Sequence, residues 1–396
     1  MKPITVLRTF FWLNLMLACW LSPLCAQQAA TAEFNTERLP SGAGPYCTVR
    51  VAPRSVRANG KWHLAYELHL RNQSPNAVDL RSVEVWGEMR DERRPTRLVQ
   101  YEGKELADNL FYPTPSDMPL PRLRLPAGQQ AVVFLWVTVA TETEVPASLH
   151  HRVRFAEGNH FRSFVVDSAR TQICRTPLPV LHQPLAGEGW YALNGPDNDS
   201  VHRRAMFSIG GQLLLAQRFA IDWIRFDQNG ATYTGDPRYN TSYHAYGAEA
   251  LAVADGIVTA VQDGIPENIP GPTRAVPMTL ETLPGNYVIV KLNNGAYAVY
   301  AHLQPHSLRV RKGDRVLQGQ ALGLVGNSGN SSEPHLHFHL GDANSPLAAE
   351  GIPYTLDAFE VTEDGQSWEL RREELPLDGA IVRFLNATLS WVSALP

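Results

Sequence analysis

Three histidines recur at every second position in the stretch Pro-His-Leu-His-Phe-His at 334–339. On a β-strand, residues two apart project from the same face, so His335, His337 and His339 would lie together with the intervening Leu and Phe packed behind them. Three imidazoles on one face indicate either a metal site or proton transfer. Taken alone, the pattern is as compatible with an ordinary structural strand, so its surroundings must decide.

Further motifs surround these histidines in a fixed order, and all are rich in glycine or end a β-like run. They are Ala220-Ile-Asp222-Trp223, Ala252-Val-Ala-Asp-Gly256, Tyr300-Ala-His302-Leu303, Gly319-Gln-Ala-Leu-Gly323 and Gly326-Asn-Ser-Gly-Asn330. In this order and spacing, residues 216–340 resemble the catalytic domain of the lysostaphin-type zinc endopeptidases, a family of peptidoglycan peptidases.

The resemblance implies a role for four residues. By match, Asp222 and His337 are zinc ligands, whereas His302 and His335 are catalytic and do not bind the metal. A catalytic zinc needs three protein ligands and one open position for water, whose pKa it lowers toward ~7. A neutral imidazole nearby can take the proton of that water, and a protonated one can stabilise the developing oxyanion.

The early His ligand of the family is displaced in this sequence. Its usual position, four residues before Asp222, holds Arg218, which cannot ligate zinc. Either His202 or His244 replaces it, or no third protein ligand exists. We favour His202, because the apolar stretch from Ser208 to Ala216 would form a hairpin that returns to Asp222, and divergent members of the family resemble this spacing. Arg218 itself is expected to form an ion pair near the site, with a clamp for a substrate carboxylate as the alternative.

The N-terminal half of the chain predicts a β-sandwich-like accessory domain over residues 46–178. Residues 62–70 alternate between apolar and polar, which is the period of a half-buried strand, whereas residues 131–139 are apolar throughout and fit a strand buried on both sides. Cys47 and Cys174 lie at the two edges of this segment, and in an exported protein they are a candidate disulfide, with two unpaired thiols as the alternative.

Two neighbouring histidines in this half, His150 and His151, carry no chemical prediction. On a strand they would point to opposite faces, so they cannot act on one ligand together.

The second domain is predicted at residues 185–360, with the β-rich fold of the resembling family, the duplicated hybrid motif, so the whole chain is expected to be all-β. Residues 285–302 form a hairpin whose Asn-Asn-Gly turn supplies residues that tolerate positive φ. Two long irregular stretches, 227–247 and 263–284, are expected to form the walls of a groove. Residues 361–396 form a C-terminal tail without a functional interpretation.

The first residues predict export. Lys2 and Arg8 precede an apolar run to Leu24, and a small-residue cleavage site follows Ala26, so residues 1–26 are interpreted as a signal peptide. A retained anchor helix is one alternative, and lipid attachment at Cys25 is another, although the preceding Ser-Pro-Leu is a poor match to a lipid-attachment motif. No later stretch is apolar for long enough to cross a bilayer, so a periplasmic or extracellular location without a stable membrane span is expected.

Composition excludes several other functions. With a net charge of −4 the chain lacks the basic excess that non-specific nucleic-acid binding requires. It holds no Gly-x-Ser-x-Gly elbow, Walker loop or His-Glu-x-x-His helix. Residues 310–323 resemble half of a biotinyl or lipoyl carrier domain, but no lysine stands at a hairpin tip there.

The sequence therefore predicts an exported zinc metalloendopeptidase that hydrolyses peptide cross-links of peptidoglycan. The alternative is a catalytically inactive module of the same fold, which binds cell-wall peptides or activates another wall hydrolase. For the N-terminal domain two roles stay open: it either positions the protein on the wall or covers the groove.

Overall fold

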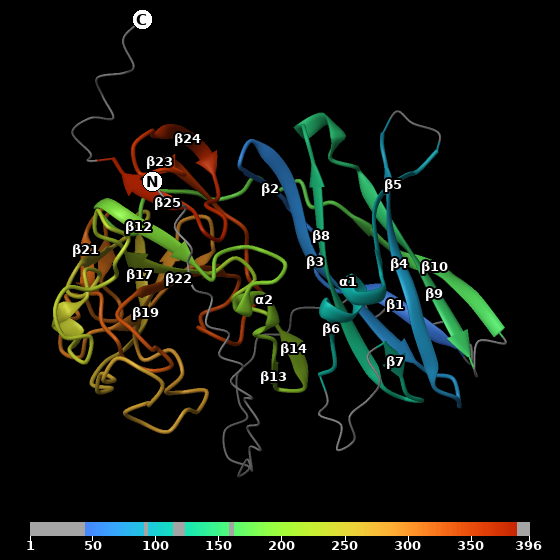
Figure 1. Ribbon diagram of the computed structural model, residues 1–396, viewed down its shortest axis with the longest axis horizontal. Coiled ribbons are helices and arrows are strands. Elements are labelled where there is room, and N and C mark those ends of the chain that lie inside the picture. The colour runs from blue at the N-terminus through green and yellow to red at the C-terminus, as the bar shows by residue number, and fades with distance from the viewer. Residues whose placement is uncertain (1–43, 91–93, 114–122, 158–161, 386–396) are drawn as a thin grey trace, which may run out of the picture. The chain divides into compact units, whose positions relative to one another are not determined.

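The computed structural model describes residues 44–90, 94–113, 123–157 and 162–385 (Figure 1). Within these ranges nearly all regular structure is strand, so the predicted all-β class is confirmed. The expected signal peptide at 1–26, and with it Cys25, lies outside the described residues. In the same ranges no helix combines the length and apolar character that a membrane crossing needs.

The N-terminal half is a sandwich of two antiparallel sheets. One sheet has the order β1-β3-β8-β6, with β2 on β3, and the other has the order β10-β9-β4-β5, with β7 on β4. Figure 1 shows β3 and β8 facing β4 and β9. The elements are β1 (Pro45–Val49), β2 (Ser55–Ala58), β3 (Lys61–Asn72), β4 (Val78–Glu88), β5 (Thr96–Glu102), α1 (Gly103–Asp108), β6 (Leu110–Phe111), β7 (Arg124–Leu125), β8 (Gln130–Val139), η1 (Glu142–Glu144), β9 (Ser148–Glu157) and β10 (Arg162–Gln172).

The C-terminal half is built on one long sheet of order β11-β23-β25-β12-β15-β22-β19-β18-β17-β20, with β24 on β23. Two further pairs of strands, β13-β14 and β16-β21, form small sheets of their own. The elements are β11 (Val180–Leu181), β12 (Gly187–Leu193), α2 (Val201–Arg204), β13 (Phe207–Ile209), β14 (Gln212–Leu214), β15 (Ile221–Arg225), η2 (Asn240–Ser242), β16 (Glu249–Leu251), β17 (Gly256–Gln262), β18 (Asn286–Leu292), β19 (Tyr297–Leu303), β20 (Arg315–Val316), β21 (Ala321–Leu324), β22 (Leu336–Gly341), β23 (Thr355–Thr362), β24 (Glu369–Glu374) and β25 (Ile381–Phe384).

Two local predictions for this half are confirmed. The hairpin around the Asn-Asn-Gly turn is the antiparallel pair of β18 and β19. The stretch from Ser208 to Ala216 contains the hairpin of β13 and β14. Residues 361–396 were interpreted as a C-terminal tail without a function. Within this segment, β24 and β25 belong to the long sheet.

The prediction that residues 62–70 form a half-buried strand is wrong, because β3 is buried on both faces. Leu64 and Leu68 pack in the sandwich core. On the opposite face Ala65 belongs to the apolar core of the C-terminal half, and Glu67 is only 4% exposed. Glu67 is thus covered by Arg203 and Arg218 of the second half of the chain and not by solvent.

The candidate disulfide is also not formed, and both cysteines are free. The Sγ of buried Cys47 lies 3.0 Å from Ser168 Oγ, whereas the Sγ of Cys174 lies 3.5 Å from Thr176 Oγ1. Each thiol has its own hydroxyl neighbour, so the two sulfur atoms do not meet.

Candidate metal centre

Strand register brings the predicted chemistry together at the middle of the long sheet. Asp222 on β15 stands opposite His337 on β22, and His337 stands opposite Ala301 on β19, next to His302. The side chains of Leu336 and Phe338 point to the other side of β22, where both are fully buried in the core. The alternation seen in the sequence therefore presents the histidines on one face.

His202 reaches this place from a different direction. It lies in α2, a single helical turn whose N-cap residue Ser200 accepts a hydrogen bond from the His202 amide. The hairpin of β13 and β14 follows and leads the chain back to β15. As a result, His202 Nε2 lies 3.4 Å from Asp222 Oδ2, and the rings of His202 and His337 meet edge to face with centroids 4.8 Å apart.

The donor atoms of His202, Asp222 and His337 all lie within 4.8 Å of one another, and all three residues are buried. Hydrogen bonds direct these donors inward: His202 Nδ1 donates to the Asn194 carbonyl at 2.8 Å, which leaves Nε2 with its lone pair facing Asp222. Two imidazole nitrogens and one carboxylate oxygen are a three-donor set that suits a divalent metal ion with a fourth position for water. The residues present therefore fit a catalytic metal.

His302 and His335 lie beside this set. Their ring centroids are 4.8 Å apart, and the His302 ring is 5.7 Å from that of His337. Each is fixed by a backbone carbonyl: His302 Nδ1 donates to Ser328 O at 2.8 Å, and His335 Nδ1 donates to Glu333 O at 2.8 Å. Because a carbonyl only accepts, Nδ1 carries the hydrogen in both rings. His302 thereby keeps Nε2 available for a proton, whereas His335 Nε2 lies 3.4 Å from Asp222 Oδ1.

The backbone of His302 is unusual, because its φ of +63° lies in the left-handed region. Residues with a Cβ rarely adopt this conformation, which costs free energy and is tolerated where the surroundings fix it. Here the His302 amide donates to the Pro284 carbonyl at 3.0 Å, and this bond holds the end of β19 in place.

Two neighbours of the donor set were not assigned from the sequence. Asn194 donates from Nδ2 to Asp222 Oδ2 at 2.9 Å, while its carbonyl accepts from His202, so it fixes two of the three donors. For His339 the sequence left open a hydrogen bond to a metal ligand or a place in the groove lining, and its Nδ1 lies 3.0 Å from His337 Nε2. Nothing in the local sequence marks Asn194, whereas the spacing of His339 was the only available signal for its contact.

His244, the other residue weighed for the third donor, does not lie in the set, and Arg218 occupies the usual position of the family's early His. His244 contacts Thr234 Oγ1 at 3.3 Å and is absent from the group of converging donors among the described residues. Arg218 is an ion-pair partner, as expected, and is almost fully buried between Glu67 and Glu350. All three side-chain nitrogens of Arg218 already donate, to Glu67, Glu350 and the Gly351 carbonyl, which argues against a clamp for a substrate carboxylate.

Burial and mutual charge set the protonation of the group. Burial alone would raise the pKa of Asp222, but His202 and His335 hold that pKa well below its ordinary range. Burial lowers the pKa of His302 far below its usual value, and the neighbouring His335 and His337 lower it further. For His335 burial is outweighed by Asp222 and Glu333, so its pKa is raised. The two histidines beside the donor set thus have pKa values shifted in opposite directions.

A narrow pocket leads to His302 and His337. Its walls include Leu283 and Pro284, at the end of the long stretch 263–284, and Pro346 and Leu347 from the segment after β22. The other long stretch, 227–247, does not line the pocket but packs beside it, where Thr232 Oγ1 donates to Glu333 at 3.2 Å. Access to the donors is therefore restricted on at least one side by the predicted loop.

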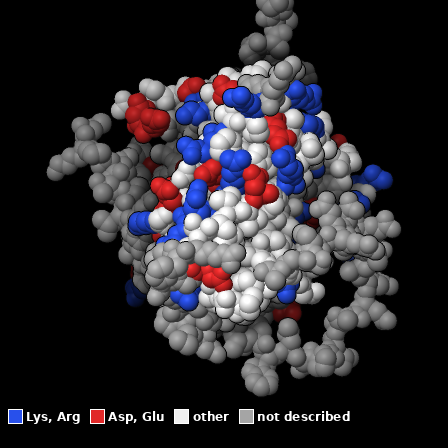
Figure 2. All heavy atoms as spheres, turned by 90° about the vertical axis from the view of Figure 1, so that its right-hand side faces the viewer, with Lys and Arg blue, Asp and Glu red and all other residues white. Residues whose placement is uncertain are grey.

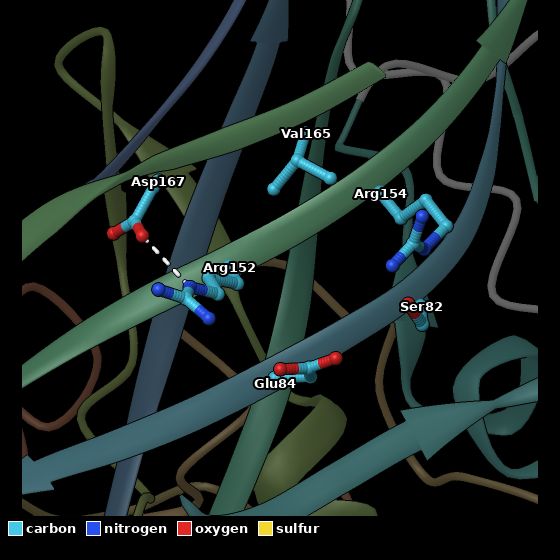
Figure 3. A pocket seen from close by; sticks show the side chains of 6 residues that line it. All are labelled: Ser82, Glu84, Arg152, Arg154, Val165 and Asp167. Atoms are coloured by element: carbon cyan, nitrogen blue, oxygen red, sulfur yellow. Dashed lines mark hydrogen bonds and ion pairs between the residues drawn. The ribbon is translucent and has the colours of Figure 1, made fainter. Parts of the chain in front are cut away.

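A larger depression, of about 370 Å³, lies on the outer face of the sandwich, across β4, β9 and β10 (Figure 3). Two of its charged groups form an ion pair, in which Arg152 Nε donates to Asp167 at 2.7 Å. Figure 2, which views this side, shows basic and acidic side chains interleaved rather than gathered by sign. Among the described residues, this depression has none of the converging metal donors of the histidine cluster.

Comparison with known proteins places this geometry in a family. Residues 242–349 match the model of peptidase family M23. The chain contains an M23 peptidase domain. The expected family is thereby confirmed, and the matched residues include His302, His335 and His337 but neither His202 nor Asp222.

The relatives of this domain include peptidoglycan endopeptidases and a cell division protein. The peptidoglycan DD-endopeptidase ShyA of Vibrio cholerae is 33% identical over 91 residues, which is 23% of this chain and 21% of ShyA. The cell division protein DipM of Caulobacter vibrioides is 43% identical over 56 residues, 14% of this chain and 9% of DipM. The chain thus matches about a fifth or less of the length of these relatives. Among solved structures, the catalytic domain of lysostaphin from Staphylococcus simulans matches with a TM-score of 0.22 and 20% identity, over 42% of this chain and 84% of that one.

Proposed function

We propose that this protein is an exported zinc metalloendopeptidase that hydrolyses peptide cross-links of bacterial peptidoglycan. The observation that carries the proposal is the convergence of His202, Asp222 and His337, with His302 and His335 beside them. The M23 match and the peptidoglycan endopeptidases among its relatives support the substrate class.

In this proposal the three converging donors hold one zinc ion. When bound, zinc supplies a Lewis acid that lowers the pKa of a coordinated water toward ~7. His302 offers the free Nε2 as the acceptor for the proton of the attacking water. His335 Nε2, which lies 3.4 Å from Asp222 Oδ1, would when protonated donate a hydrogen bond to the oxygen of the scissile carbonyl as negative charge develops there.

The experiment that tests the proposal is the zinc content of the purified protein, compared with His202→Ala and His337→Ala, followed by an assay on cross-linked peptidoglycan fragments. About one zinc per chain that both substitutions remove, together with cleavage of a cross-link, supports it. If His337→Ala loses zinc and His202→Ala keeps it, the third donor lies elsewhere.

The alternative of a non-catalytic wall-binding module is decided by the same experiment. A protein that binds wall fragments but holds no zinc after zinc is supplied, and cleaves nothing, would be such a module. The complete set of His302, His335 and His337 favours the enzyme, because a binding module needs none of these side chains in this arrangement.

A further inference from the structure

Four charged side chains are buried together where the sandwich meets the M23 domain. Glu67 of β3 accepts from Arg218 Nη2 at 2.6 Å and from Arg203, and Arg218 Nη2 also donates to Glu350 at 2.5 Å. Glu67, Arg203 and Arg218 are each no more than 4% exposed. Buried charges are costly unless they are paired, so the two arginines depend on these two carboxylates.

The two arginines are attached to the segments that carry the metal donors. Arg203 directly follows His202 in α2, and Arg218 stands four residues before Asp222. Glu67 binds both, across sequence separations of 136 and 151 residues. The Glu67 carboxylate of the sandwich therefore holds both ends of the segment that connects His202 to Asp222.

The connecting loop has little structure of its own to hold His202. The helix α2 spans only Val201–Arg204, which is too short to be stable without tertiary contacts. Apart from the bond of His202 to the Asn194 carbonyl, it is held by the sandwich: Arg203 Nη2 donates to the Tyr66 carbonyl at 3.2 Å, and Leu215, farther along the loop, packs on Val132 and Phe134 of β8. The position of His202 thus depends in part on the face of β3 and β8.

We propose that Glu67 is a positioning residue for the metal centre, so that the sandwich is a structural part of the site and not a removable cover. The expected effect of Glu67 on zinc binding rests on the proposed function. The expected effect of Glu67 on the position of the segment around His202 is independent of the proposed function. The inference predicts that a folded protein without the Glu67 charge has a looser α2 and binds zinc more weakly.

The test compares Glu67→Gln with Leu68→Ala in the full chain. The amide keeps the shape of Glu67 but removes its charge. Leu68 is the next residue of β3, points into the sandwich core and touches neither arginine, so it controls for general loss of stability. The readouts are hydrogen–deuterium exchange of residues 200–205 without added metal, and zinc affinity by competition with a chelator.

Glu67→Gln is expected to speed exchange at 200–205 and to weaken zinc binding roughly 10-fold, the lower end of the effect known for groups that orient metal ligands. Leu68→Ala is expected to lower the melting temperature and to leave both readouts unchanged. If Glu67→Gln folds with unchanged exchange and affinity, or if both variants change equally, the inference is overturned.

Two further arms keep the outcome decisive. If Glu67→Gln does not fold, Glu67→Asp keeps the charge on a shorter stem, and the same comparison with Leu68→Ala applies to it. If the unaltered protein binds no zinc, the proposed function fails, while exchange at 200–205 still decides whether Glu67 holds α2.

Discussion

The sandwich and the M23 domain both bury histidines along their strands, but the ring nitrogens meet different partners. In the sandwich, His63 contacts Thr138 Oγ1 at 3.0 Å and the Ala58 carbonyl at 3.1 Å, so both nitrogens are used by neutral groups. His151 likewise contacts the Tyr66 hydroxyl at 2.8 Å and the Ala169 carbonyl at 2.9 Å. These rings are satisfied, and nothing remains for a ligand.

In the M23 domain, one ring nitrogen of His202 bonds the Asn194 carbonyl, and one ring nitrogen of His337 contacts His339. His202 and His337 turn the remaining nitrogen toward Asp222, at 3.4 and 2.8 Å. Burial and alternation are the same in both regions, so neither distinguishes them. The difference is convergence on a shared carboxylate, and this is the property that a search for metal sites should use.

The largest expected effect is that of His337→Ala, which removes a donor from the centre of the set. Zinc content should fall to background, and hydrolysis of peptidoglycan fragments should become undetectable, because the two remaining donors cannot complete the site. His151→Ala is the matched sandwich variant and should keep zinc and activity. Elemental analysis and the fragment assay measure both; zinc retained by His337→Ala would break the comparison.

His302→Ala should separate chemistry from metal binding. Since the imidazole is proposed to accept a proton and does not ligate, the variant should keep about one zinc per chain while its rate falls on the order of 10²–10⁴-fold. Single-turnover hydrolysis by the zinc-loaded protein checks this. A variant that loses zinc would instead make His302 a metal ligand.

A smaller effect is expected for His339→Ala, which removes the partner of His337 Nε2. Groups that orient a metal ligand typically contribute 10–100-fold in affinity, so chelator competition should show a loss of about that size. The contrasting variant is His63→Ala, which should cost about 1–3 kcal/mol of unfolding free energy because it leaves buried polar groups unpaired. It should leave zinc affinity unchanged, and a change in zinc affinity equal to that of His339→Ala would show that burial alone matters.

The smallest expected effect is a loss of stability at acidic pH that comes from Glu67. Burial alone would raise the pKa of Glu67, but Arg218 and Arg203 hold it at about 2, below the ordinary value of 4.5. A carboxyl whose pKa is lower in the folded state stabilises the protein above its unfolded pKa and loses this contribution as protons bind. Unfolding free energy should therefore decline as the pH falls from 4.5 toward 2.

Urea denaturation at several pH values measures this decline. Glu67→Gln has no proton to bind at this position, so its stability should depend less steeply on pH over the same window. Equal slopes for the two proteins would show that Glu67 does not contribute the acid dependence.

The sequence predicted those parts of the site that are written in short-range patterns. The alternation of residues along the strand predicted that His337 and His339 lie on one face. The Asn-Asn-Gly turn predicted the position of the hairpin of β18 and β19. Even the hairpin after His202 followed from local apolar residues. In each case neighbouring residues determine the geometry, so one segment is sufficient for the prediction.

The remainder depends on contacts between distant segments. Asn194 joins Asp222 to His202 through its own turn, and no motif marks it. The alternation of β3 predicted that one face of the strand is exposed to solvent, because a glutamate such as Glu67 is usually exposed. Its burial depends on the ion pairs with Arg203 and Arg218, which come from distant segments. Burial by another domain is not encoded in the strand that becomes buried.

The left-handed backbone of His302 has a consequence for engineering this protein. Glycine adopts this conformation without the steric cost that any Cβ brings, so His302→Gly should relieve about 1 kcal/mol of strain. The same substitution removes a buried ring and leaves the Ser328 carbonyl without its donor, which should cost about 1–3 kcal/mol. A library screened only for heat resistance would therefore keep histidine here, so folding stability alone preserves a side chain that the proposed chemistry also needs.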